Sequence, residues 1–136
     1  MVKVGIIGGT GVGQDSSLLQ NIAEVSVFDT PYGTPSDSVI VCGRIGNVEV
    51  VIIGRHGKNH NVNPSNVNYR ANLWLLKAQK CTHVLATTAC GSLQTDIKPG
   101  SFCILNQYID RYFDLFATNL KGLQIYIFFL FLEPKA

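Results

Sequence analysis

The chain opens with an apolar run that stops at a cluster of glycines. Residues 2–7 are mostly valine and isoleucine, and four glycines follow within residues 8–13. A β-branched run closed by a glycine-rich turn predicts a buried strand that ends in a backbone loop. Asp15, Ser16 and Ser17 are residues that cap helices, so we expect a short helix after this loop.

Further along, strand-like and helix-like patterns alternate. β-branched runs bounded by turn-forming residues predict strands, and apolar residues at helical spacing predict a helix that Pro64 and Ser65 open. The expected elements are a strand over residues 25–28, a loop over 29–37, a strand pair over 38–45 and 48–53, a helix over 66–80, and strands over 82–88 and 102–105.

Strands mixed with helices, without a long repeat, indicate an α/β protein. We expect a mixed β-sheet flanked by helices. Loops at strand ends are the usual ligand sites of such sheets. Three of the expected loops carry small or cationic residues, namely 8–13, 54–60 and 87–92.

An almost wholly apolar segment covers residues 123–132. Its length is about half of what a transmembrane helix needs, so we expect no membrane span. The simplest interpretation is a buried strand or helix, and the alternative is a segment that does not belong to the fold. Exposed, such a segment would favour aggregation.

Composition narrows the classes of partner. The 136 residues include 11 basic and 9 acidic side chains, a net charge of +2, and 46% are hydrophobic. This balance gives no electrostatic reason to expect nucleic acid or a membrane surface as a partner, so a bound anion needs a local site. The four cysteines form no C-x-x-C pair, and the first residues show no secretory signal. We therefore expect reduced thiols and a cytoplasmic or nuclear protein.

The glycine-rich loop is the first candidate for ligand binding. It lacks P-loop spacing, and Gly13 comes one residue early for a dinucleotide fingerprint. Asp29 lies near the position of a ribose-binding acid, so a dinucleotide-binding module stays open as an alternative. Consecutive N–H groups without side chains can surround an anion, and Thr10 adds a hydroxyl donor. The same pattern also suits a tight turn that binds nothing.

The second candidate is the cationic loop that begins at Arg55. Arg55 offers a planar fork for phosphate oxygens, His56 adds a donor, and Gly57 permits close approach. His56 and His60 have the spacing of half a metalloprotease motif, but the glutamate is absent, so we expect no metal. A solvated cationic loop is the alternative.

The third candidate is the loop over residues 87–92. Thr87 and Thr88 supply hydroxyls, and the small residues after them suit close contact with a sugar or phosphate. Cys90 is a conceivable nucleophile, although cysteines among small residues more often pack. Packing is also the interpretation for Cys42, Cys81, Cys103, His83 and Trp74.

Taken together, these loops resemble one known family. The chain is similar, over residues 2–111, to the N-terminal part of the 5′-methylthioadenosine phosphorylases, a branch of the trimeric purine nucleoside phosphorylases. The blocks that carry the resemblance are, in order, VGIIGGTG, DTPYGTPSD, GRHGKNH, NVNYRANLWLLK, CTHVLATTACGSL and IKPGSFCILNQYIDR.

The resemblance implies phosphorolysis, in which inorganic phosphate attacks 5′-methylthioadenosine to give adenine and 5-methylthioribose 1-phosphate. Other nucleosides are alternative substrates. It implies no metal or organic cofactor, with phosphate as co-substrate, and a homotrimer. It assigns phosphate binding to Thr10, Arg55, His56, Thr88 and the Ala89 backbone, with Gly9 and His60 beside them.

Residues 112–136 match none of the family's blocks that read the base, so we expect a truncated phosphorylase with an apolar tail and assign no catalytic residue. Two further hypotheses follow, an inactive fragment that pairs with full-length subunits and the dinucleotide-binding module above.

Overall fold

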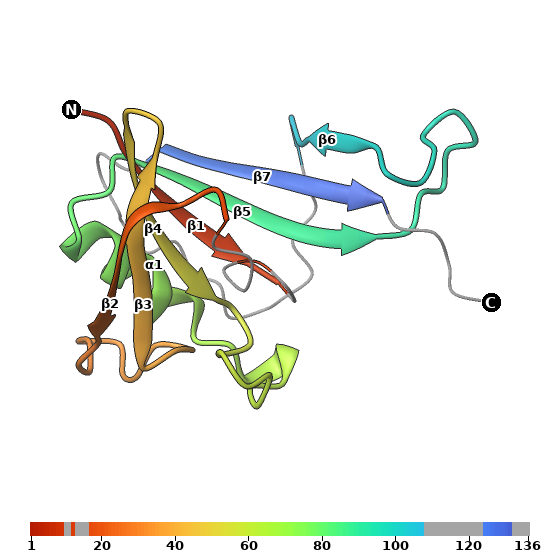
Figure 1. The fold of residues 1–136 in the computed structure, drawn as a ribbon. Helices are drawn as coiled ribbons and strands as arrows, with labels where there is room; N and C mark the ends of the chain where they lie inside the picture. Colours follow the sequence, from red (N-terminus) through yellow and green to blue (C-terminus); the bar gives the residue numbers. More distant parts are fainter. Residues whose placement is uncertain (10–11, 13–16, 108–123, 132–136) are drawn as a thin grey trace.

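The computed structural model describes residues 1–9, 12, 17–107 and 124–131. Within these residues a mixed seven-stranded sheet runs in the order β2-β3-β4-β1-β5-β7-β6 (Figure 1). The strands are β1 (Lys3–Gly8), β2 (Gln20–Ser26), β3 (Val39–Ile45), β4 (Val48–Gly54), β5 (His83–Cys90), β6 (Phe102–Ile104) and β7 (Gln124–Phe131). The prediction of a mixed α/β sheet is confirmed.

β1 lies at the centre and pairs in parallel with both β4 and β5. Ile6 stands opposite Ile52 on one side and Leu85 on the other. Central parallel strands are covered on both faces, which is why their sequences are nearly continuous apolar runs. All three strands run the same way, so their carboxyl ends lie on the same side of the sheet.

β3 and β4 form the predicted antiparallel pair, and Gly46 takes the positive φ of 56° that the tight turn requires. β2 pairs with β3 at the outer edge, and all of its residues are exposed. Here two predictions were wrong. Residues 17–19 form a turn and an extended link into β2 instead of a helix, and the strand expected over 25–28 begins at Gln20 and ends at Ser26.

The helix α1 (Tyr69–Ala78) covers one face of the sheet (Figure 1). Leu75 and Leu76 join the core, whose buried members are Ile7, Ile40, Val51, Ile53, Leu75, Leu76, Cys81 and Val84. Gly5 of β1 allows the close approach, because a Cβ there would lie 2.7 Å from a methyl group of Leu76.

The helix is shorter than the pattern predicted. Pro64–Asn66 forms a separate 3₁₀ turn, η1. The Asn68 side chain accepts a hydrogen bond from the Ala71 N–H at 3.1 Å, which caps α1 and fixes its start. Lys80 has a φ of 62°, so the helical path ends before it.

β5 continues to Cys90, so Ala89 and Cys90 belong to the strand and not to the loop that the sequence predicted. β7 pairs in parallel with β5, and β6 pairs antiparallel with β7. The apolar segment near the end of the sequence therefore forms a strand of the sheet. Residue 111, at which the motif blocks end, lies outside the described residues.

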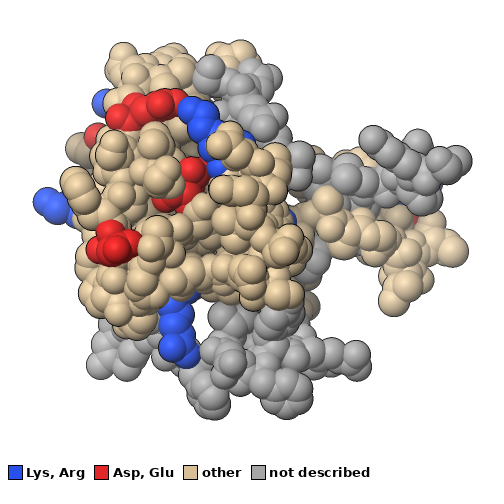
Figure 2. Space-filling model, turned by 90° about the horizontal axis from the view of Figure 1, so that it is seen from below, with Lys and Arg blue, Asp and Glu red and all other residues tan. Residues whose placement is uncertain are grey.

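Charged groups are sparse on the surface. On the face shown in Figure 2, acidic and basic side chains stand in small separate groups among uncharged residues. Among the described residues no helix is long and apolar enough to cross a membrane.

Candidate functional site

The candidate site lies where β4 and β1 end beside β5. Arg55 directly follows β4, and its backbone N–H donates to the Gly8 carbonyl at the end of β1 at 2.9 Å. Its Nη1 donates to the Thr87 carbonyl of β5 at 2.7 Å. Thr87 lies one residue past Ala86, the last residue of β5 that pairs with β1. One arginine therefore joins the ends of β4 and β1 to β5 at the point where β5 extends beyond β1.

His56 holds the guanidinium of Arg55 from the other side. Arg55 Nε donates to His56 Nε2 at 3.2 Å, and His56 Nδ1 lies 3.0 Å from the Val62 carbonyl oxygen. A carbonyl only accepts, so Nδ1 carries the proton, and Nε2 is free to accept from arginine. The imidazole is thus a neutral link between Arg55 and the loop that follows it.

The remaining end of the guanidinium faces the glycine-rich loop. A Cβ at Gly9 would lie 2.9 Å from Arg55 Nη2, so a side chain at position 9 would displace the arginine. Within the part of the chain that the structure describes, Nη2 has no hydrogen-bond partner. This leaves charged N–H donors for an anion.

The other predicted site residues have the following positions. Thr10 lies outside the described residues. Thr88 and Ala89 follow Thr87 directly in β5, Thr88 partly buried and Ala89 exposed. His60 is exposed and has a φ of 52°, with its N–H bonded to the Gly57 carbonyl at 3.1 Å. The structure thus brings together Gly9, Arg55, His56 and the end of β5.

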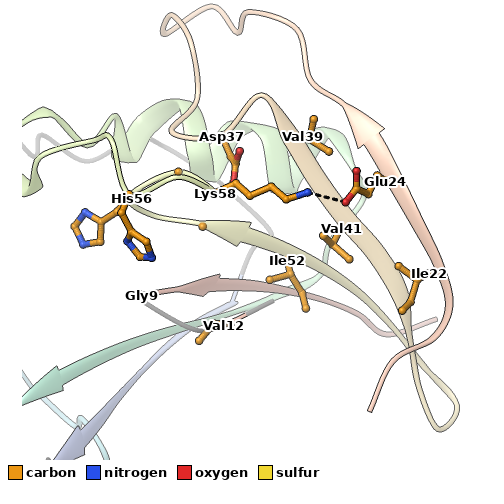
Figure 3. A pocket seen from close by; sticks show the side chains of 13 residues that line it. Gly9, Val12, Ile22, Glu24, Asp37, Val39, Val41, Ile52, His56 and Lys58 are labelled. Atoms are coloured by element: carbon orange, nitrogen blue, oxygen red, sulfur yellow. Dashed lines mark hydrogen bonds and ion pairs between the residues drawn. The ribbon is translucent and has the colours of Figure 1, made fainter. Parts of the chain in front are cut away.

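A cavity of about 410 Å³ lies beside this arrangement, on the side of β2 and β3 (Figure 3). Of the predicted site residues it touches Gly9, His56 and His60, but neither Arg55 nor Thr88. Its walls are formed by Val12, Ile22, Glu24, Asp37, Val39, Val41, Ile52, Gly54, Gly57 and Lys58. The cavity and the arginine contact with β5 are therefore neighbouring features with a shared wall.

Lys58 does not add its charge to the arginine. Its Nζ forms an ion pair with Glu24 Oε1 of β2 at 2.9 Å, and both side chains are more than half exposed (Figure 3). The hydrogen bond from Lys58 to Glu24 raises the pKa of the lysine. The cationic loop of the sequence is thus divided, with Arg55 directed to the strand ends and Lys58 to the sheet edge.

Asp37 is a residue of this region that the sequence analysis did not single out. Burial raises the pKa of its carboxyl group, and hydrogen bonds from the backbone N–H groups of Lys58, Val39 and Ser38 oppose that rise. The only sequence signal was an aspartate at the end of a turn-rich segment, a common position for side-chain to backbone bonds.

The dinucleotide alternative is not supported by the topology. The fingerprint needs a helix after the loop and a next strand beside β1, whereas β2 lies three places away at the sheet edge. Asp29 accepts a hydrogen bond from the Thr34 hydroxyl at 2.6 Å, within its own turn.

Comparison with models of protein families shows to which family the chain belongs. Residues 3–130 match the model of the phosphorylase superfamily.

The chain belongs to the phosphorylase superfamily.

Individual relatives agree with this assignment. The S-methyl-5′-thioadenosine phosphorylase of Danio rerio is 53% identical over 110 residues, which are 81% of this chain and 38% of that protein. The enzyme of the same name from Drosophila pseudoobscura pseudoobscura is 48% identical over 128 residues, 89% of this chain and 43% of that protein. The chain thus spans about two fifths of the length of these phosphorylases.

Solved structures show the same fold. A methylthioadenosine phosphorylase from Schistosoma mansoni in complex with tubercidin superposes with a TM-score of 0.71 at 53% identity, covering 80% of this chain and 38% of that one. The apo form from the same organism gives a TM-score of 0.72 at 52% identity, with the same coverage. The nucleoside phosphorylase-like fold is therefore shown.

The described residues contain no cluster of three metal-ligating side chains. Both ring nitrogens of His56 have partners within the chain.

The cysteines differ in their surroundings. Cys81 is buried in the core, as predicted, and Cys42 packs partly against it. Cys103 is partly buried in β6 and does not belong to that core cluster. Burial raises the pKa of the Cys90 thiol, which argues against an activated nucleophile.

Cys81 is expected to be the least reactive thiol. Burial raises its pKa to about 11, and its exposed fraction is 6%. At pH 8 its thiolate fraction is on the order of a hundredfold below that of an ordinary cysteine. A short iodoacetamide pulse read by mass spectrometry should label Cys90 and Cys103 well before Cys81. In denaturant all four should react alike, and equal native rates for Cys81 and Cys90 would contradict the burial of Cys81.

Proposed function

We propose that this chain binds inorganic phosphate where β1 and β4 end beside Thr87 of β5. We further propose that its reaction is the phosphorolysis of 5′-methylthioadenosine to adenine and 5-methylthioribose 1-phosphate. The observation that carries the proposal is the position of Arg55. It reaches across the end of β1 to the Thr87 carbonyl and leaves Nη2 beside Gly9. The names of the relatives supply the nucleoside.

The arrangement suits phosphate because its donors are preorganised. Arg55 is held at three points, by the carbonyls of Gly8 and Thr87 and by His56, so little freedom is lost when an anion binds. Gly9 gives the anion room to approach the guanidinium. We propose that Thr10, Thr88 and the Ala89 N–H complete the set, with His60 nearby.

Catalysis in this scheme is positioning and electrostatics. Phosphate attacks C1′ while the bond to the base breaks, so positive charge develops on the ribosyl group in an oxocarbenium-like transition state. A dianion held beneath the sugar stabilises that charge, and bound reactants avoid an entropic cost. In the observed geometry His56 contributes by orienting Arg55. Phosphate is the co-substrate, and no organic cofactor takes part.

The remaining parts of the proposal concern partners. We propose a cytoplasmic protein whose partners are phosphate and a nucleoside, with homotrimer assembly as in the family that it resembles. We assign no residue of this chain to recognition of the base. Phosphate binding and nucleoside turnover are therefore separate expectations.

Two measurements on the 136-residue chain test the proposal. Sulfate or phosphate should raise the unfolding temperature, since a ligand at a hundred times its Kd stabilises by about 2.7 kcal/mol. A nicotinamide dinucleotide should have no such effect. Adenine release from 5′-methylthioadenosine, measured with and without phosphate, tests turnover. Protection without release would confirm the phosphate site and overturn the reaction for this chain, and absence of both would overturn the whole proposal.

A further inference from the structure

Resting on the proposed phosphate site, we propose that Asp37 is a positioning residue for that site. Its carboxylate fixes the loop of residues 54–58, and through this loop it holds the Arg55 guanidinium where an oxyanion can be bound. Asp37 itself makes no contact with the anion in this scheme.

The carboxylate touches both ends of the loop. It accepts a hydrogen bond from the backbone N–H of Lys58, as well as from those of Ser38 and Val39, the two residues that follow it in sequence. Its Oδ2 lies 3.2 Å from the point that a Cβ at Gly54 would occupy. Figure 3 shows Asp37 beside Lys58, at the base of the loop that carries His56. Asp37 thus ties the start of β3 to the segment that leaves β4.

The neighbouring residue Ser36 presses on the middle of the same loop. Gly57 is buried with a φ of +75°, and a Cβ there would lie 3.0 Å from the Ser36 carbonyl oxygen. Because Gly57 has no side chain, the two backbones pack directly against each other. The segment of Ser36 and Asp37 therefore contacts residues 54, 57 and 58.

This segment is itself anchored to the core helix. Asn72 of α1 is 1% exposed, accepts from the Ser36 N–H at 2.9 Å and donates to the Ser36 hydroxyl at 2.9 Å. Asn68 at the start of α1 donates to the carbonyls of Tyr32 and Thr34. The helix therefore holds Ser36 by hydrogen bonds, and the next residue along the chain, Asp37, contacts the loop of Arg55.

The charge of Asp37 makes the inference testable by its sign. A carboxylate near an anion site repels the anion, so the negative charge of Asp37 by itself weakens anion binding. If only charge mattered, Asp37→Asn would strengthen anion binding. If the carboxylate positions the loop, the same substitution weakens binding, because asparagine accepts fewer and weaker hydrogen bonds from the three backbone donors.

The experiment measures sulfate affinity of the full 136-residue chain at neutral pH, where sulfate is fully ionised. Asp37→Asn is expected to weaken sulfate binding about tenfold. Glu24→Gln is the matched control, because it removes the same charge from an exposed carboxylate whose one bond among the described residues is to the Lys58 side chain. The control is expected to bind as the unaltered protein does, or slightly tighter. Unchanged or tighter binding by Asp37→Asn would overturn the inference.

Two further readings remain informative if a variant folds poorly or if the unaltered protein does not bind sulfate. The Lys58 backbone amide, on an exposed residue, should be protected from hydrogen exchange in the unaltered protein, and free exchange would overturn the inference. The Nε–H resonance of Arg55, bonded to His56, should be sharp in the unaltered protein and broadened in Asp37→Asn. If the unaltered protein does not bind sulfate, but the Lys58 amide and the Arg55 Nε–H resonance behave as expected, the phosphate site is refuted and the positioning role of Asp37 in the loop is retained.

Discussion

Replacing Arg55 with alanine is expected to abolish the stabilisation of the chain by sulfate or phosphate. The guanidinium is the charged group that contacts β5 through the Thr87 carbonyl, and its Nη2 is the donor left without a partner among the described residues. A hydrogen bond to a charged group contributes about 1.5–3 kcal/mol. Loss of two such bonds lowers anion affinity by at least about a hundredfold. The measurement is the slope of unfolding temperature against sulfate concentration.

The slope is the proper readout because Arg55→Ala also changes the unliganded protein. The Thr87 carbonyl loses its donor, which costs about 1 kcal/mol or somewhat more. Arg55→Lys should give an intermediate loss, since lysine keeps the charge without the planar fork. Arg44→Ala is the control, because within the described part of the chain the Arg44 side chain bonds to the Asn47 carbonyl at the β3–β4 turn, away from the site. If the unfolding temperature of Arg55→Ala rises with sulfate as steeply as that of the unaltered protein, the proposed phosphate site is refuted.

The sequence predicted the central part of the fold because burial there determines the pattern. β4 has four consecutive buried residues, and β1 and β5 are buried or partly buried over most of their length, so their apolar runs are visible without any structure. Because these strands are parallel neighbours, the residues after Ile7, Ile53 and Ala86 come together. Spacing marked the loops that carry Arg55 and the glycines as candidate sites, whereas their place in one site was implied by the family resemblance.

The sheet edge could not be predicted in the same way. β2 is exposed along its whole length, so no face of it requires apolar residues. Val25 is 37% exposed and Phe28, which looked like part of a strand, is 85% exposed beyond its end. The ion pair between Lys58 and Glu24 depends on this strand and was missed with it.

Single polar side chains set the other boundaries. The apolar spacing gave the helix face correctly, but the start of α1 depends on one hydrogen bond to Asn68. Asp37 and Asn72 were missed for a related reason. Their importance comes from donors and acceptors that lie 21 and 36 residues away in sequence, on Lys58 and Ser36, and local patterns contain no signal for such contacts.

Leu76→Ala is expected to cause the largest loss of stability. Leu76 of α1 is fully buried against the central strand β1. Removing its three terminal carbons leaves a cavity and should cost about 3 kcal/mol or more. For a chain of this size that corresponds to a fall in unfolding temperature of about 10 °C. Leu93→Ala is the control, since Leu93 is wholly exposed and the same change there should have little effect.

A double-mutant cycle with Gly5 tests the reason for this cost. A Cβ at Gly5 would lie 2.7 and 2.8 Å from the two methyl groups of Leu76, so Gly5→Ala alone should destabilise by about 1–3 kcal/mol through overpacking. In the Leu76→Ala background the clash is removed and the added methyl partly fills the cavity, so Gly5→Ala should then be neutral or stabilising. The coupling should exceed about 1 kcal/mol in urea unfolding. Additive effects would mean that helix and strand do not touch at this point, and the packing of α1 on β1 would have to be redrawn.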